Sequence, residues 1–221
     1  FALLVMWAGN SDTPGLLYVA VAMASVSMYI VIVERAARWR DVAGWLAKAG
    51  GLALACSAWI LVKTYYAAEA LDARLADTEL PSASATTSSW SESLRGLGNW
   101  LSYFREEGRL LKPQTTDYFE QQWVVVATFV MPVIALVVVW RSQWRARLLF
   151  GALAVGGVVV MVGGFGSPNA SPLGEGILAL LERDAFFEAF RNTYKAGSGV
   201  VIGVAVLSSV GAVEAFRWCR S

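Results

Sequence analysis

Five nearly uncharged apolar runs constrain the fold of this chain more than any other feature of its sequence. They cover residues 15–33, 50–66, 123–140, 148–165 and 197–216, and each approaches or reaches the ~20 residues that a helix needs to cross a bilayer. Only 16% of the 221 residues are charged, whereas soluble domains carry about a quarter. The ten tryptophans fall largely at the edges of the runs, where an amphipathic ring suits the membrane interface. The sequence therefore predicts an all-α membrane protein, a polytopic helical bundle of about five full transmembrane helices.

The first residues indicate a further helix that is incomplete. Residues 1–8 are apolar and no charged segment precedes them, so a signal peptide fits poorly. We expect this stretch to be the end of a truncated sixth helix, in a fragment of a larger protein. Asp12, Thr13 and Pro14 form a helix-start signal before the first full run. Pro132 lies inside the third run, where we expect a tolerated kink.

The charges outside the apolar runs predict the orientation. The connection around residues 34–49, the connection at 141–147 and the C-terminus are short and mainly basic, whereas residues 64–122 carry nine acids against five bases and residues 166–196 carry four against three. Basic loops stay in the cytoplasm. We therefore expect a bacterial cytoplasmic (inner) membrane protein with two long outer loops, 67–121 and 166–196. Lys63, near the outer end of its run, is expected to reach the headgroups.

Other residue types narrow the chemistry. The chain has no histidine, and its two cysteines, Cys56 and Cys219, occupy settings that make a mutual disulfide a poor prediction. We expect no metal site and identify no cofactor. We also expect no nucleic-acid partner. The expected surroundings are membrane lipid.

The first outer loop contains a candidate amphipathic helix. Residues 67–80 are charged and helix-prone, and residues 81–89 form a small polar linker. Over residues 91–104, an apolar stripe falls on one helical face, with two tryptophans beside it: Leu94, Leu97, Leu101, Phe104, Trp90 and Trp100. The helix lies either on the outer membrane surface or against the bundle, because both use this spacing. Trp90, Trp100 and Tyr194 are candidate interface or cleft-lining residues.

The second outer loop contains the candidate binding residues. Residues 166–172 favour a sharp turn, and the leucines and isoleucine that follow predict a short amphipathic helix. Three phenylalanines come next, and then Arg191, Asn192 and Lys195 directly before the last apolar run. A guanidinium, an amide and an ammonium at the membrane surface suit the phosphate of a lipid carrier. The alternative is that these bases contact only ordinary lipid phosphates.

The order of these motifs resembles a known family. Met131-Pro132 lies in one span, a Gly-Gly-Phe-Gly sequence ends the next, and Phe-Phe-x-x-Phe-Arg-Asn-x-x-Lys covers residues 186–195. Over roughly residues 90–215 this is similar to the membrane region of GT-C-type glycosyltransferases, particularly the α-(1→3)-arabinofuranosyltransferases of actinobacterial cell-wall assembly. Large membrane proteins of the YfhO type share a similar pattern.

The resemblance implies an enzyme that moves a sugar, with arabinofuranose as the candidate, from a polyprenyl-phosphate-linked donor to a glycan acceptor outside the membrane. It also implies an acidic catalytic base in an outer loop upstream of Phe1, to which Asp72, Asp77 and Asp117 cannot be matched. The catalytic residues therefore stay unknown. Two alternatives remain open: a transporter or flippase of a lipid-linked sugar, and a non-catalytic membrane scaffold.

Overall fold

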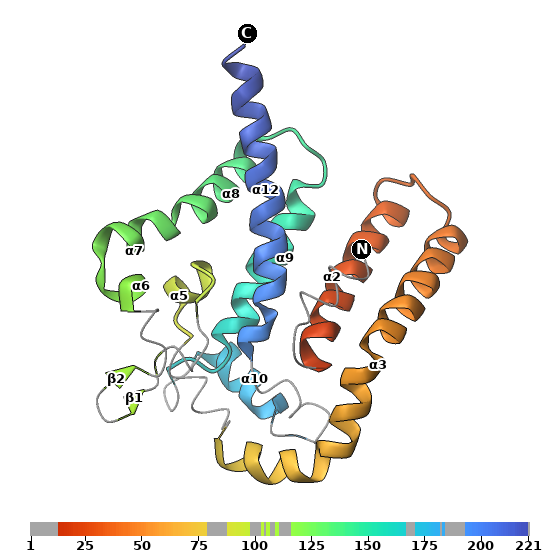
Figure 1. The fold of residues 1–221 in the computed structure, drawn as a ribbon. Coiled ribbons are helices and arrows are strands. Elements are labelled where there is room, and N and C mark those ends of the chain that lie inside the picture. The colour runs from red at the N-terminus through yellow and green to blue at the C-terminus, as the bar shows by residue number, and fades with distance from the viewer. Residues whose placement is uncertain are drawn as a thin grey trace. The chain divides into compact units, whose positions relative to one another are not determined.

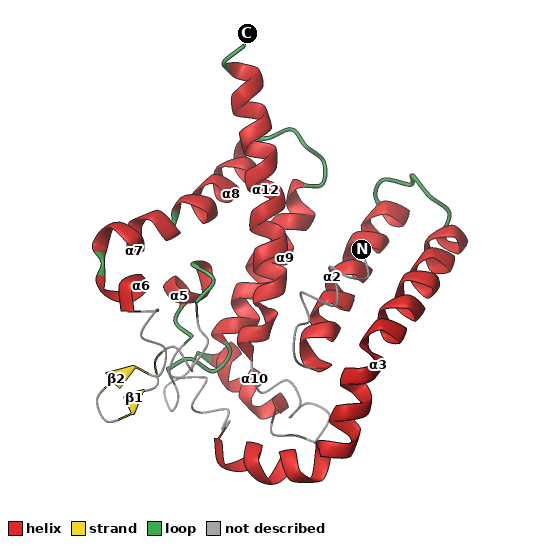
Figure 2. Cartoon of the chain, viewed as in Figure 1, coloured by secondary structure: helices red, strands yellow, loops and turns green. Residues whose placement is uncertain are grey.

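The computed structural model describes residues 13–78, 88–97, 103, 105–106, 109–110, 116–166, 171–181, 183 and 193–220. The chain divides into two compact units, Phe1–Thr78 and Glu79–Ser221. Almost all of the described residues are helical, as Figure 2 shows. The expected all-helical class is therefore confirmed, apart from one very small hairpin in the second unit.

The first unit is a pair of helices, α2 (Thr13–Ile32) and α3 (Trp39–Thr78), which contact each other (Figure 1). Helix α2 begins within the expected start signal and ends one residue before the expected end at residue 33. At the turn, the Tyr29 hydroxyl donates a hydrogen bond to the Glu34 carboxylate (3.2 Å). Arg35 then takes a positive φ of 51°, a conformation that helps the chain to reverse.

Helix α3 is much longer than the apolar run that predicts it. It has 40 residues, starting 11 residues before residue 50 and ending 12 after residue 66. Arg40, Asp41 and Lys48, which the sequence places in a basic connection, therefore lie on the helix. The apolar run covers only the middle of α3, because the charged residues on both sides of it also favour a helix. The helix-prone charged segment that follows residue 66 continues the same helix, as its composition indicates.

The second unit holds the remaining described elements. A two-residue antiparallel ladder pairs Arg105 with Leu110 and Glu106 with Arg109. The elements, in chain order, are α5 (Trp90–Leu94), β1 (Arg105–Glu106), β2 (Arg109–Leu110), α6 (Thr116–Glu120), α7 (Gln122–Thr128), α8 (Val130–Arg141), α9 (Arg147–Val162), α10 (Pro172–Leu181), η3 (Thr193–Ala196) and α12 (Gly197–Trp218).

Helix α12 packs against both α9 and α8, and this three-helix contact forms the core of the second unit (Figure 1). Leu207 is 1% exposed and contacts Ala135 and Val138 of α8. Between α9 and α12, glycines let the two backbones approach closely. A Cβ at Gly203 would lie 2.5 Å from the Phe150 carbonyl oxygen, so the interface uses small residues as membrane helix pairs commonly do.

The third apolar run is broken into α7 and α8 at Phe129. The cause is Pro132, which has no N–H to donate to the carbonyl of Thr128 and whose ring crowds that carbonyl. The Phe129 N–H instead bonds to the carbonyl of Val126, three residues back (3.1 Å). The expected kink is present, and it lies three residues before the proline.

Among the described residues, two helices are long and apolar enough to cross a membrane: Gln122–Arg141 and Thr193–Trp218. Two further apolar helical stretches, Ala20–Ile32 and Arg147–Val162, are shorter. The expected count of five full spans is therefore not confirmed. The expected truncated helix at residues 1–8 lies outside the described residues.

The two expected amphipathic loop helices have different outcomes. Helix α10 is present where residues 173–181 predict it. The expected helix over 91–104 is wrong, because α5 ends at Leu94 and Gly96 follows with a φ of 75°. The Gly96 N–H bonds to the Ser93 carbonyl and the Leu97 N–H to the Glu92 carbonyl. This is the Schellman arrangement that terminates helices at glycine. Leu101, Phe104 and Trp100 lie outside the described residues.

Candidate functional site

A double-glycine turn at the end of α9 contacts two segments of the connection between α9 and α12. Gly163 has a φ of 48° and a ψ of −125°, a conformation that side chains disfavour. A Cβ on Gly163 would lie 3.2 Å from Thr193, the first residue of η3, and a Cβ on Gly164 would lie 2.4 Å from Leu178 of α10. The turn therefore leaves room for η3 and for α10 at the same end of α9.

Thr193 fixes the start of the last helical segment. Its hydroxyl donates a hydrogen bond to the Met161 carbonyl of α9 (3.1 Å). Thr193 is 6% exposed, Met161 2% and Ala196 3%. A polar side chain buried this far is costly unless it is hydrogen-bonded, and this bond satisfies it. The backbone that leads into α12 is thus held against α9.

Lys195, a candidate binding residue, lies beside Tyr194, a candidate interface or cleft-lining residue. Both lie in η3 and are half-buried. The Lys195 ammonium lies 5.9 Å from the centre of the Tyr194 ring, within the range of a cation–π contact. The Ser198 hydroxyl donates to the Lys195 carbonyl (3.2 Å), which joins η3 to the first turn of α12. Arg191 and Asn192 lie outside the described residues.

Trp90 is the first residue of α5 and is 55% exposed. Helix α5 contacts α9. This packing favours the second of the two expectations for the first outer loop, contact with the bundle, for the few residues that α5 contains. Trp100 lies outside the described residues.

Arg95 makes several long-range contacts in the second unit, although no sequence motif marks it. Its Nε donates to the Thr128 hydroxyl (2.7 Å), and one of its terminal nitrogens donates to the Tyr118 carbonyl. Its guanidinium lies 5.7 Å from the centre of the Phe129 ring. Arg95 therefore joins the end of α5 to α6 and to the break between α7 and α8. No local pattern could have revealed this, because Arg95 and Thr128 are 33 residues apart.

A partly buried phenol lies near Arg95. Burial raises the pKa of the Tyr103 hydroxyl well above its usual range, and the Glu92 carboxylate raises it further, while Arg95 acts in the opposite direction. The Tyr103 ring also contacts that of Phe119 in α6, with 4.7 Å between the ring centres. This phenol is therefore neutral at physiological pH.

Within the part of the chain that the structure describes, no three histidine, cysteine or acidic side chains gather in a way that could hold a metal ion. Cys56 and Cys219 are both free thiols. In η3, the described polar side chains beside the end of α9 are those of Thr193, Tyr194 and Lys195.

Comparison with known proteins identifies the family. The family model of the α-(1→3)-arabinofuranosyltransferase N-terminal GT-C domain matches residues 13–218. This range is wider than the 90–215 over which the motifs suggest the resemblance. The search of characterised proteins and the search of solved structures gave no significant match. The family match covers nearly the whole chain, and the protein accordingly belongs to the membrane-embedded GT-C glycosyltransferase family of the α-(1→3)-arabinofuranosyltransferases.

Proposed function

We propose that this chain forms part of an enzyme that transfers a sugar from a polyprenyl-phosphate donor to a cell-envelope glycan outside the membrane. The observation that carries the proposal is the family match over residues 13–218. The family name points to arabinofuranose as the sugar.

The proposed site for the donor phosphate is formed by Arg191, Asn192 and Lys195. Departure of a lipid phosphate places negative charge on its oxygens, and positioned cations stabilise that charge. The η3 segment supports this site, because the Thr193 hydrogen bond to Met161 holds the backbone two residues before Lys195. A site that must hold a phosphate in one position needs such support behind its binding groups.

Lys195 is suited to this role by its place in the chain. It lies in η3, at the start of the 26-residue helical segment Thr193–Trp218 that is apolar enough to span a membrane. The positive end of a helix dipole favours an anion there. Residues of this chain would thus stabilise the departing phosphate, and none of them is assigned as the catalytic base.

The proposed topology has five spans, with α2, α3, α7 with α8, α9, and η3 with α12 as the crossing segments. The α8–α9 connection is bordered by Arg141 and Arg147, and α12 ends near Arg217. These basic ends would face the cytoplasm of a bacterium. In a Cys56→Ser/Cys219→Ser background, a cysteine at position 84 should react with an impermeant thiol reagent from outside. Reaction only after the cytoplasmic side is opened would reverse the orientation.

The transfer reaction tests the phosphate site. In the full-length protein, Arg191→Ala and Lys195→Ala should each raise the donor KM about tenfold or more, the loss expected for one charge-assisted contact to phosphate. Arg183→Ala is the matched control, because Arg183 is an exposed base of the same loop outside the proposed site. Its KM should not change.

Measuring sugar transfer and donor movement across the membrane separates the remaining alternatives. A flippase would show donor movement across the membrane without sugar transfer, and a scaffold would show neither. Unchanged donor KM and unchanged turnover in both the Arg191 and Lys195 variants would refute the phosphate site while leaving the family membership intact.

A further inference from the structure

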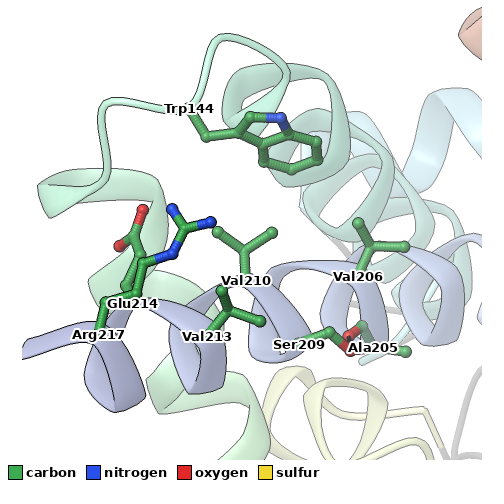
Figure 3. Close-up of a pocket in the computed structure, with 8 residues that line it drawn as sticks. All are labelled: Trp144, Ala205, Val206, Ser209, Val210, Val213, Glu214 and Arg217. Atoms are coloured by element: carbon green, nitrogen blue, oxygen red, sulfur yellow. Dashed lines mark hydrogen bonds between the residues drawn. The ribbon is translucent and has the colours of Figure 1, made fainter. Parts of the chain in front are cut away.

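The C-terminal half of α12 borders a hollow that is apolar along its length and charged at one end. Its volume is about 620 Å³, within the ~300–1,000 Å³ of small-molecule sites. Figure 3 shows Val206, Val210 and Val213 along its floor, Trp144 of the α8–α9 connection opposite them, and Glu214 and Arg217 together at one end. The hollow therefore combines an apolar part with a charged part, as an amphiphilic molecule does.

The Glu214 carboxylate is held in place by the α8–α9 connection. The Ser142 hydroxyl donates to Glu214 Oε1 (2.5 Å), and the same hydroxyl oxygen accepts a hydrogen bond from the backbone N–H of Trp144 (3.0 Å). Ser142 is 2% exposed. Because the serine has only one hydroxyl proton and directs it to Glu214, the carboxylate is kept as a hydrogen-bond acceptor at a fixed position.

A second hollow, of about 660 Å³, adjoins the first and shares Val213 and Arg217 with it. Phe216 and Arg220 also line it, and the Arg220 guanidinium lies 4.2 Å from the centre of the Phe216 ring. Figure 1 shows the last turns of α12 extending beyond α8 and α9. Arg217 thus lines both hollows, whereas the fixed carboxylate of Glu214 lines the first and the guanidinium of Arg220 lines the second.

We propose that this end of α12 binds a phospholipid whose headgroup carries a primary amine, of the phosphatidylethanolamine type. The phosphate is bound by Arg217 and Arg220, since guanidinium groups match phosphate oxygens in charge and geometry. The ammonium is bound by Glu214, and one acyl chain lies along the valines. The charge pattern of the site, cation–cation–anion, is complementary to the phosphate and ammonium of this headgroup.

The position of the site fits a lipid. It lies at the C-terminal end of a helix that is long and apolar enough to span a membrane, where headgroups meet a spanning helix. In the topology proposed above, this is the inner leaflet, on the opposite side from the sugar donor. The inference itself depends only on the membrane embedding of the family and is independent of the proposed phosphate site at Lys195.

Headgroup selectivity follows from Glu214. Phosphatidylglycerol offers the same phosphate but no cation, and its negative charge gains nothing from a carboxylate. Phosphatidylcholine offers a cation that cannot donate a hydrogen bond. A single charge-assisted hydrogen bond gives roughly tenfold discrimination, so we expect phosphatidylethanolamine to bind about tenfold more tightly than either.

Native mass spectrometry of the delipidated full-length protein, titrated separately with the three lipids, measures this selectivity. Glu214→Gln should bring the ratio between phosphatidylethanolamine and phosphatidylglycerol close to one, while Arg217→Gln should weaken both lipids about tenfold. The control is Arg40→Gln, because Arg40 is an exposed arginine on α3 outside both hollows. Equal binding of the three lipids to the unaltered protein would overturn the proposal.

A second measurement locates the lipid. It does not depend on the Glu214→Gln variant, which could be less stable because it alters the hydrogen bond between Ser142 and Glu214. A phosphatidylethanolamine with a photoactivatable acyl chain should label the peptide that contains residues 205–213 in the unaltered protein. Arg217→Gln should reduce this labelling about tenfold at a fixed lipid concentration. Labelling confined to other peptides, or covering of this face by another part of the full-length protein, would refute the site.

Discussion

Two adjacent glycines in α9 should respond in opposite directions to the same substitution. A Cβ added at Gly156 would meet no atom within 4 Å. A Cβ added at Gly157 would lie 2.8 Å from Val200 Cγ2, 2.9 Å from the Val200 backbone nitrogen and 3.0 Å from the Ala196 carbonyl oxygen. Two of these three atoms belong to the backbone of η3 and α12 and cannot move away by rotating a side chain.

The magnitudes follow from these contacts. Replacing glycine by alanine inside a helix ordinarily gains ~1 kcal/mol, which is the full effect expected at Gly156. At Gly157 the same gain is opposed by overpacking, which costs about 3 kcal/mol where backbone must shift. Gly157→Ala should therefore lower the free energy of unfolding by about 2 kcal/mol, and the two variants should differ by about 3 kcal/mol.

Unfolding in mixed micelles, driven by increasing the fraction of a denaturing detergent, measures both free energies under identical conditions. The comparison removes any effect of helix propensity, because the two positions share a helix and the same chemical change. If Gly157→Ala proves as stable as Gly156→Ala, the close approach of α9 and α12 at this point is refuted.

Three further substitutions test single contacts. Thr193→Val keeps the shape of the side chain but removes the bond to Met161, so unfolding free energy should fall by about 1–2 kcal/mol, whereas Thr193→Ser should retain most of it. Arg95→Gln removes the bond to Thr128 and should speed hydrogen exchange in α7 while leaving α12 unchanged; equal protection in α7 would contradict the role of Arg95. The folded protein binds the Tyr103 proton more tightly than the unfolded chain does. The stability that this difference contributes is complete below about pH 10 and is lost as the pH rises further. Tyr103→Phe should therefore reduce the alkaline loss of stability, and an unchanged decline between about pH 9 and 12 would exclude Tyr103 as its source.

Hydrophobic runs predicted where the helices of this chain lie but not how far they extend. The last run, residues 197–216, differs from α12 by two residues at one end. For α3 the error is large, because a charged helix-forming segment continues an apolar one without any signal in hydrophobicity. Gly96 is the reverse case, since a single positive φ ended a helix that the apolar spacing predicted to continue. Periodicity therefore carries little information about helix ends.

Long-range contacts account for what the sequence could not predict at the candidate site. Lys195 was identifiable because the bases cluster in sequence just before a span. The bond from Thr193 to Met161, which supports that segment, joins residues 32 positions apart. Gly163 and Gly164 were visible as part of a Gly-Gly-Phe-Gly motif, but only the positions of Thr193 and Leu178 explain why both must lack side chains.

The length of α9 has a consequence for the membrane around it. Its 16 residues extend about 24 Å at 1.5 Å per residue, whereas the hydrocarbon core of a typical bilayer is ~30 Å thick. In the five-span topology this mismatch thins the bilayer locally or draws the Gly163 turn below the headgroup layer. Local thinning would bring the headgroup layer down to the Gly163 turn, and so to Lys195, where we propose that the donor phosphate binds.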